Sequence, residues 1–191
     1  MIHETVVTTR TRAGQAHVTP LGVQRDGEFV VLAPFRPSTT LDAILDSSFA
    51  VVNATDDVRI FAGCIVGRRD WPLCDADRIP GVRLRGALSH EELELVEAVD
   101  DPVRPRLRMR RVHAATHAPF PGFNRAQAAV IEAAILVSRL RMLPAQKIDA
   151  EIAYLSIAVD KTAGPAEREA WGWLMDAITT HRGAAGAAAA K

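Results

Sequence analysis

The front of the chain alternates apolar and polar residues with a spacing of two, which is the pattern of half-buried β-strands. Segments of this kind follow one another from residue 2 to about residue 118: HETVVTTR, AHVTPLGV, EFVVLAP, SFAVVNAT, IFAGCIVG, LELVEAV and RLRMRRVHA. Turn signals separate the early segments, and Asp26-Gly27 is a strong hairpin signal between apolar strands. The pattern therefore predicts a meander or Greek-key barrel.

Two stretches of this front half depart from the strand pattern. Residues 39 to 46 predict a short helix, because Leu41, Ile44 and Leu45 fall on one face. Residues 68 to 86 have no clean period and contain two prolines, which is typical of a long loop. We expect this loop to lie over the barrel mouth, with Trp71 either stacking on a ligand or fixing the loop to the core.

Beyond Pro119-Phe120-Pro121-Gly122 the apolar spacing changes to that of helices. One helix is predicted over residues 124 to 142, a second begins near Pro144, and Gly164-Pro165 marks the start of a third. Their apolar stripes are expected to pack on one another, on the barrel or across a dimer axis. On the first helix Arg125, Glu132 and Arg139 recur every seven residues, which favours a solvated face or dimer contact over a substrate carboxylate site.

These patterns predict a mainly β front and a helical back, an α+β chain. We expect a barrel domain over residues 1–120 and a helical subdomain over residues 121–183. The low-complexity ending GAAGAAAAK predicts a disordered tail over residues 184–191.

The composition is that of an ordinary folded protein, with 48% hydrophobic and 24% charged residues. Lysine plus arginine and aspartate plus glutamate both total 23, so the net charge gives no general attraction to nucleic acid or to an anionic membrane. No stretch approaches 18 consecutive apolar residues, and the N-terminus lacks a signal-peptide pattern. Cys64 and Cys74 predict neither a disulfide framework nor a zinc site. We therefore expect a cytoplasmic protein with reduced thiols.

The predicted helix of the front half begins with three hydroxyl residues, Ser38, Thr39 and Thr40. The first N–H groups of a helix have no intrahelical acceptor, and the helix dipole favours negative charge there, so this start suits an anion such as phosphate. Arg36 can add a bidentate guanidinium contact. The alternative is an ordinary capping box of Thr39 with Asp42, beside a solvated Arg36.

The order strand, TP turn, strand, R-P-S-T-T-L helix and F-x-V-V-N strand resembles the flavin reductase-like branch of the FMN-binding split barrels. More closely, the chain resembles an uncharacterised family of domains of unknown function from archaea and methanopterin-using bacteria. The residues that carry this likeness are MIHETVVTT, PLGV, RPSTTL, VVNATDD and GFNRAQAAVIEAAILVSRLR. Members of that family are known as dimeric FMN binders. The resemblance therefore implies a split barrel, bound FMN and a homodimer.

The same resemblance assigns roles to particular positions. It implies that Ser38, Thr39 and Thr40 hold the FMN phosphate; the lysine of the flavin reductase pattern is absent, which leaves Arg36 as the main cation and Arg10 or Arg12 as a second. It places the isoalloxazine ring edge beside the backbone of Thr19, Pro20, Leu21 and Gly22, and above Asn53.

Each of these ring-edge assignments has a structural alternative. Pro20 and Gly22 can simply bend an edge strand, and Asn53 can cap the turn before Asp56-Asp57. His17 shares a strand face with Thr19, but a lone strand histidine is more often a surface residue.

No metal site is expected from the histidines. His113 and His117 have the i, i+4 spacing of helical ligands, but they follow a strand pattern that would separate them by about 13 Å. The phosphate-loop, dinucleotide-binding and hydrolase motifs are also missing.

Three functions remain open at this stage. The first is an FMN-dependent oxidoreductase acting on a small molecule, with a pterin or another one-carbon cofactor as a candidate substrate. The second is an FMN-binding carrier or assembly protein without turnover. The third is a structural dimer whose helices recruit a protein partner. The resemblance implies the cofactor more directly than any substrate.

Overall fold

The computed structural model describes residues 1–189, with side chains described through residue 184. The chain forms two compact units. The barrel unit contains residues 1–56 and 69–120, and the helical unit contains residues 57–68 and the chain from Pro121 onward. Within residues 1–189 no helix is both long enough and apolar enough to cross a membrane.

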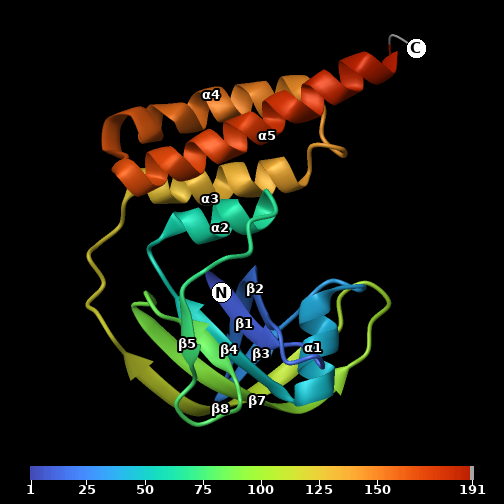
Figure 1. Ribbon diagram of the computed structural model, residues 1–191, viewed down its shortest axis with the longest axis vertical. Helices are drawn as coiled ribbons and strands as arrows, with labels where there is room; N and C mark the ends of the chain where they lie inside the picture. Colours follow the sequence, from blue (N-terminus) through green and yellow to red (C-terminus); the bar gives the residue numbers. More distant parts are fainter. Residues whose placement is uncertain (190–191) are drawn as a thin grey trace. The chain divides into compact units, whose positions relative to one another are not determined.

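Six strands of the barrel unit close into an antiparallel barrel (Figure 1). Their order around the barrel is β1-β2-β3-β8-β7-β4. The bounds are β1 Ile2–Arg10, β2 Ala16–Asp26, β3 Phe29–Leu32, β4 Phe49–Ala54, β7 Ser89–Val99 and β8 Arg106–Thr116. The barrel predicted from the period-two pattern is confirmed.

The barrel interior is filled by alternate apolar residues of the strands, because successive side chains on a strand point to opposite faces. The predicted helix is present as α1, Thr39–Ser47, and its Leu41 and Ile44 belong to the same core. The strand residues of this core are Val7, Val23, Val30, Leu32, Ala50, Val52, Leu93, Leu107 and Met109.

The outer face of the barrel wall is covered in part by a small hairpin. Its strands are β5, Leu73–Asp75, and β6, Val82–Leu84, so the predicted loop over residues 68–86 contains regular structure. The hairpin is tied to the barrel by polar contacts: Thr8 donates its hydroxyl proton to the carbonyl of Val82. This face of the wall is therefore buried although the polar residues Thr8 and Asn53 lie on it beside Val6 and Val51.

The prediction of a barrel strand for the segment IFAGCIVG is wrong. Residues Val58–Ile65 form helix α2, and Asp57 caps the helix by accepting a hydrogen bond from the backbone N–H of Arg59. A short, continuously apolar run does not distinguish a buried strand from a buried helix. Residues 57–68 join the helical unit, where Val58 and Ala62 pack in its core.

The three predicted C-terminal helices are present, as α3 Arg125–Ser138, α4 Ala145–Thr162 and α5 Pro165–Ala189. Small residues of α3, such as Ala133 and Ala134, face Leu174 of α5 in the core of the helical unit. Helix α5 continues through residues 184–189, where the sequence predicted a disordered tail, because alanine has the highest helix propensity. The rest of that predicted tail, residues 190 and 191, lies outside the described residues.

Candidate functional site

The start of α1 has the geometry expected of an anion-binding helix terminus. Ser38 is the N-cap residue in an extended conformation, and its hydroxyl accepts a 3.3 Å hydrogen bond from the backbone N–H of Leu41. Ser38 therefore replaces the alternative capping box of Thr39 with Asp42. The backbone N–H groups of Thr39 and Thr40 precede any possible intrahelical acceptor, so they are available to a ligand.

Arg36 lies just before this helix start and makes a weak contact. Its guanidinium is 2.9 Å from a carboxylate oxygen of Asp100, but the two side chains are 42% and 81% exposed. An exposed pair of this kind contributes about 0–1 kcal/mol, so Arg36 can exchange Asp100 for another anion at little cost.

A second arginine reaches the same region from a distant part of the chain. The backbone N–H of Arg36 donates to the carbonyl of Val103, which places residues 100–104 beside it. Arg104 donates from Nε to the carbonyl of Ala33, and its guanidinium lies 4.7 Å from the ring centroid of Phe35. Arg104 is therefore the second cation of this region, and no local sequence signal identifies it.

The second cations proposed from the sequence, Arg10 and Arg12, lie away from the start of α1 in this structure. Arg10 and Arg12 border a hollow with Asp46 and Ser47, in the last turn of α1. Arg10 is also 3.0 Å from a carboxylate oxygen of Asp75. Since a nine-residue helix is about 13 Å long, these arginines lie at the opposite end of α1 from its hydroxyl start.

Strand β2 offers a backbone edge at the predicted ring-contact positions. It pairs with β1 along residues 16–24, but it pairs with β3 only through residues 23–26. The other edge of residues 16–22, which include Thr19, Pro20, Leu21 and Gly22, has no strand partner in the described barrel. Leu21 packs against the core that contains Leu41 of α1, so this edge and the helix start belong to adjacent elements.

Gly22 also allows a close approach within the protein. A Cβ atom at this position would meet Cγ2 of Ile2, on the neighbouring strand, at 2.7 Å. The close approach that glycine permits here is therefore made by the protein's own β1 strand.

Asn53 does not join the other predicted residues. Its side chain is fully buried, and its amide nitrogen donates to the carbonyl of Val6 at 3.0 Å and to the hydroxyl of Thr8 at 3.1 Å. Its amide oxygen accepts from the backbone N–H of Leu84, in the outer hairpin, at 2.8 Å. The amide thus bonds to the protein on the outer face of the barrel wall, where it ties β6 to β1 and β4.

His17, Trp71 and the charged residues of α3, also considered in the sequence analysis, make no contact within the described part of the chain that indicates a ligand site. His17 is half-buried, and burial, followed by the positive charge of Arg69, lowers the pKa of its imidazole. The indole N–H of Trp71 is buried without an acceptor among the described residues. The charged residues Arg125 and Glu132 of α3 and its C-cap residue Arg139 are all exposed.

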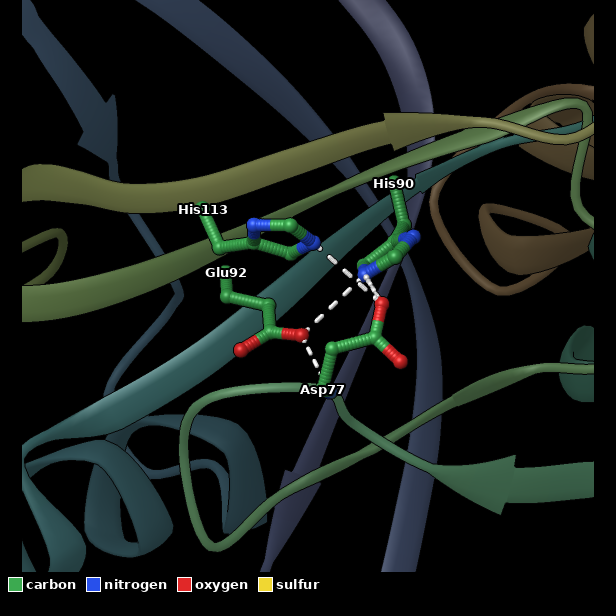
Figure 2. A group of neighbouring side chains, drawn as sticks. All are labelled: Asp77, His90, Glu92 and His113. Atoms are coloured by element: carbon green, nitrogen blue, oxygen red, sulfur yellow. Dashed lines mark hydrogen bonds and ion pairs between the residues drawn. The ribbon is translucent and has the colours of Figure 1, made fainter.

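A cluster that the sequence analysis missed lies on the outer face of the wall (Figure 2). His90 and Glu92 come from β7, His113 comes from β8, and Asp77 comes from the turn between β5 and β6. One ligand-type atom of each side chain lies within 4.8 Å of the other three. The residues are spread over three segments, and only the i, i+2 spacing of His90 and Glu92 hints at a shared strand face.

Glu92 holds this cluster together. Its fully buried carboxylate accepts hydrogen bonds from the backbone N–H groups of Asp77, Arg78 and Ile79, the last two at 2.8 and 3.0 Å. Burial raises the pKa of Glu92, but these bonds and one from His90 outweigh it, and the net shift is downward. Glu92 is therefore a carboxylate that fixes the turn at residues 77–79.

His90 has a contact at each ring nitrogen. Its Nδ1 lies 2.9 Å from Nε2 of His117, whose ring stacks on it with a centroid distance of 5.1 Å. Its Nε2 lies 3.2 Å from a carboxylate oxygen of Glu92 and 3.6 Å from one of Asp77. This fully buried imidazole is therefore oriented by its neighbours.

Comparison with known families and structures is consistent with this fold. The N-terminal domain profile of a protein of unknown function (DUF447) matches residues 3–118, and a second DUF447 profile matches residues 124–176. No curated protein sequence matches the chain.

Among solved structures, an FMN-bound DUF447 protein from Methanosarcina mazei is 20% identical, with a TM-score of 0.81 over 92% of this chain and 94% of that one. Flavoredoxin from Methanosarcina acetivorans is 14% identical, with a TM-score of 0.53 over 61% and 69% of the two chains. The 2-nitrobenzoate 2-nitroreductase of Pseudomonas fluorescens is 18% identical, with a TM-score of 0.52 over 60% and 64%. The fold is thus the split barrel of flavin reductase-like proteins, followed by three helices.

Proposed function

This chain belongs to the DUF447 family, and we propose that it binds FMN and acts as a homodimeric oxidoreductase on a small molecule. The observation that carries the proposal is the start of α1. The first backbone N–H groups of the helix lack an intrahelical acceptor, and Arg36 stands two residues before its N-cap residue. Arg104 contacts Ala33 and Phe35 in the segment before the helix, and the chain shares its fold over 92% of its length with an FMN-bound protein.

The start of α1 holds the phosphate of FMN in this proposal. The N–H groups of Thr39 and Thr40 and the hydroxyl of Thr39 donate to phosphate oxygens, and the helix dipole adds a favourable field. Arg36 leaves its exposed contact with Asp100 and makes a bidentate contact with the phosphate. Arg104 supplies the second positive charge that a phosphate dianion requires.

Residues 19–22 of β2, which β3 does not pair with up to Gly22, orient the ring in this proposal. Backbone N–H and C=O groups of this segment pair with the polar edge of a flavin, except at Pro20, which has no N–H. The carbonyl of Leu21 already accepts a 2.8 Å hydrogen bond from the hydroxyl of Thr5, so the remaining groups of this segment carry the contact. FMN supplies the hydride or electron chemistry when bound, and the protein contributes binding and orientation.

The phosphate assignment is tested by comparing FMN with riboflavin, which lacks the phosphate. We expect the double variant Arg36→Ala/Arg104→Ala to bind FMN at least about tenfold more weakly, because each charge-assisted contact contributes about 1.5–3 kcal/mol. Riboflavin affinity should stay unchanged. The matched control is Arg12→Ala, at the other end of α1. Flavin fluorescence titration measures both ligands, and equal losses for FMN and riboflavin would place the phosphate elsewhere.

Turnover is tested separately from binding. The bound flavin is reduced anaerobically and then mixed with candidate oxidants, beginning with pterins and other one-carbon cofactors. Reoxidation faster than by dissolved oxygen identifies a substrate class. If every compound reoxidises the flavin no faster than dissolved oxygen does, the result would instead support an FMN carrier. Light scattering of the purified protein tests the proposed homodimer.

A further inference from the structure

The cluster of Asp77, His90, Glu92 and His113 on the outer face of the barrel has the donor set of a metal site (Figure 2). Two imidazoles and two carboxylates converge, each offering one ligand atom. Imidazole and carboxylate are the nitrogen and oxygen ligands of zinc in proteins.

The distances between these ligand atoms match a small tetrahedral ion. A tetrahedral ion with bonds of about 2.0–2.1 Å separates neighbouring ligand atoms by about 3.3–3.4 Å. Nε2 of His90 is 3.2 Å from Oε1 of Glu92, and Nε2 of His113 is 3.3 Å from Oδ2 of Asp77. Nε2 of His90 is 3.6 Å from the same oxygen of Asp77. Three of the six distances between pairs of ligand atoms are thus already near the values expected around a bound tetrahedral ion.

The proton arrangement of His90 also suits coordination. If its Nδ1–H donates to Nε2 of His117, 2.9 Å away, its Nε2 presents a lone pair. Without a metal, an Nε2 proton of His90 donates to Glu92; a cation that replaces this proton has the carboxylate oxygens of Glu92 and Asp77 as its neighbours. The His117 contact is the outer hydrogen bond that a metal-bound histidine usually makes.

Among the residues whose side chains are described, Asp77 and Glu92 form their ion pairs with the two histidines. With neutral imidazoles the four ligands carry two negative charges, which a divalent cation would neutralise.

The cluster is rigid on one side and open on the other. His90 and Glu92 are fully buried, and Glu92 is fixed by the backbone N–H groups of residues 77–79. The side chains of Asp77 and His113 are 45% and 28% exposed, so an ion can enter from their side. Oε1 of Glu92 has a second lone pair beside the one that accepts from the N–H of Asp77.

We propose that Asp77, His90, Glu92 and His113 bind one divalent metal ion, Zn²⁺, in a four-coordinate structural site. His117 positions the ring of His90 and is not a ligand. Since all four positions come from the protein, the ion clamps the turn at residues 77–79 onto β7 and β8 and leaves no open position for a substrate. This site is separate from the proposed phosphate site, and its test does not require FMN.

The test titrates chelator-treated protein with Zn²⁺ and with Co²⁺. We expect one Zn²⁺ per chain, a higher melting temperature with Zn²⁺, and the intense visible absorption of tetrahedral Co²⁺. The exposed ligands are changed in His113→Gln and Asp77→Asn, which avoids disturbing the buried residues, and each should weaken Zn²⁺ binding by at least about tenfold. His17→Gln, a half-buried histidine on β2, is the matched control and should bind as tightly as the unchanged protein.

The proposal is overturned if the unchanged protein takes up no Zn²⁺, or if both ligand variants bind as tightly as it does. If bound Co²⁺ gives only the weak absorption of a six-coordinate ion, this result would also contradict the four-ligand site. Melting curves recorded without metal show whether each variant is folded, so a loss of binding by a folded variant is attributable to the missing ligand.

Discussion

The two faces of the barrel wall are both buried but are built in opposite ways. Leu93 and Glu92 are neighbours on β7, and both side chains are fully buried. Leu93 points into the apolar interior, where an apolar side chain of similar volume satisfies its surroundings. Glu92 points outward beneath the turn at residues 77–79, where each carboxylate oxygen has particular donors. The inner face therefore supplies most of the stability, and the outer face specifies which segment covers the wall.

The largest expected effect comes from the inner face. Leu93→Ala should lower the free energy of unfolding by about 2–5 kcal/mol, because it removes apolar contacts and leaves a cavity that neighbours only partly fill. Urea denaturation measures the change. Val96→Ala is the control on the same strand, since Val96 is 50% exposed and should cost little. Equal losses for the two variants would contradict the assignment of Leu93 to the core.

A smaller but more local effect is expected on the outer face. Glu92→Gln keeps the side-chain shape but replaces charge-assisted hydrogen bonds, and should cost about 1.5–3 kcal/mol. The backbone N–H groups of Arg78 and Ile79 should lose hydrogen-exchange protection before those of the barrel strands. Exchange is measured in metal-free protein. A uniform loss of protection across the barrel would mean that Glu92 supports the whole wall rather than the turn.

The smallest expected effect is a pH dependence at His17. Burial and then Arg69 lower the pKa of this imidazole in the folded protein, so the unfolded chain binds a proton more readily. The stability that neutral His17 contributes is present above its ordinary pKa of 6.5 and is lost as the pH falls below it. His17→Gln should flatten this part of the stability profile, measured by urea denaturation between about pH 7.5 and 5.5. A His17→Gln profile as steep as that of the unchanged protein would contradict this role of His17.

The inner face was predictable from the sequence and the outer face was not. Alternating apolar residues give the barrel strands and their interior directly, and the spacing of Ile148, Ile152 and Val159 gives the helical character of α4. The outer cluster arises only when β7, β8 and the turn before β6 meet, and strand register is a tertiary property. For the same reason Asn53 was predicted as a ligand contact, because its partners in β1 and β6 are distant in sequence.

The candidate phosphate site was half predictable. Ser38, Thr39 and Thr40 form a local helix-start signal, which needs no knowledge of distant segments. Arg104 was missed because its segment reaches Ala33 and Arg36 through tertiary contacts, which local sequence does not show. The position of Arg10 and Arg12 was also not predictable, because the sequence does not say which end of α1 the first hairpin meets.

The excursion of residues 57–68 into the helical unit has a consequence for modularity. The chain passes between the two units three times, after residues 56, 68 and 120, so neither unit is one continuous stretch. A fragment that ends at residue 120 would retain Val58 and Ala62 of α2 but lose their partners Val130 and Leu174. Truncation or gene fusion at residue 120 would therefore expose the apolar surface of α2. We expect that the helical unit can be exchanged or lost in evolution only together with α2.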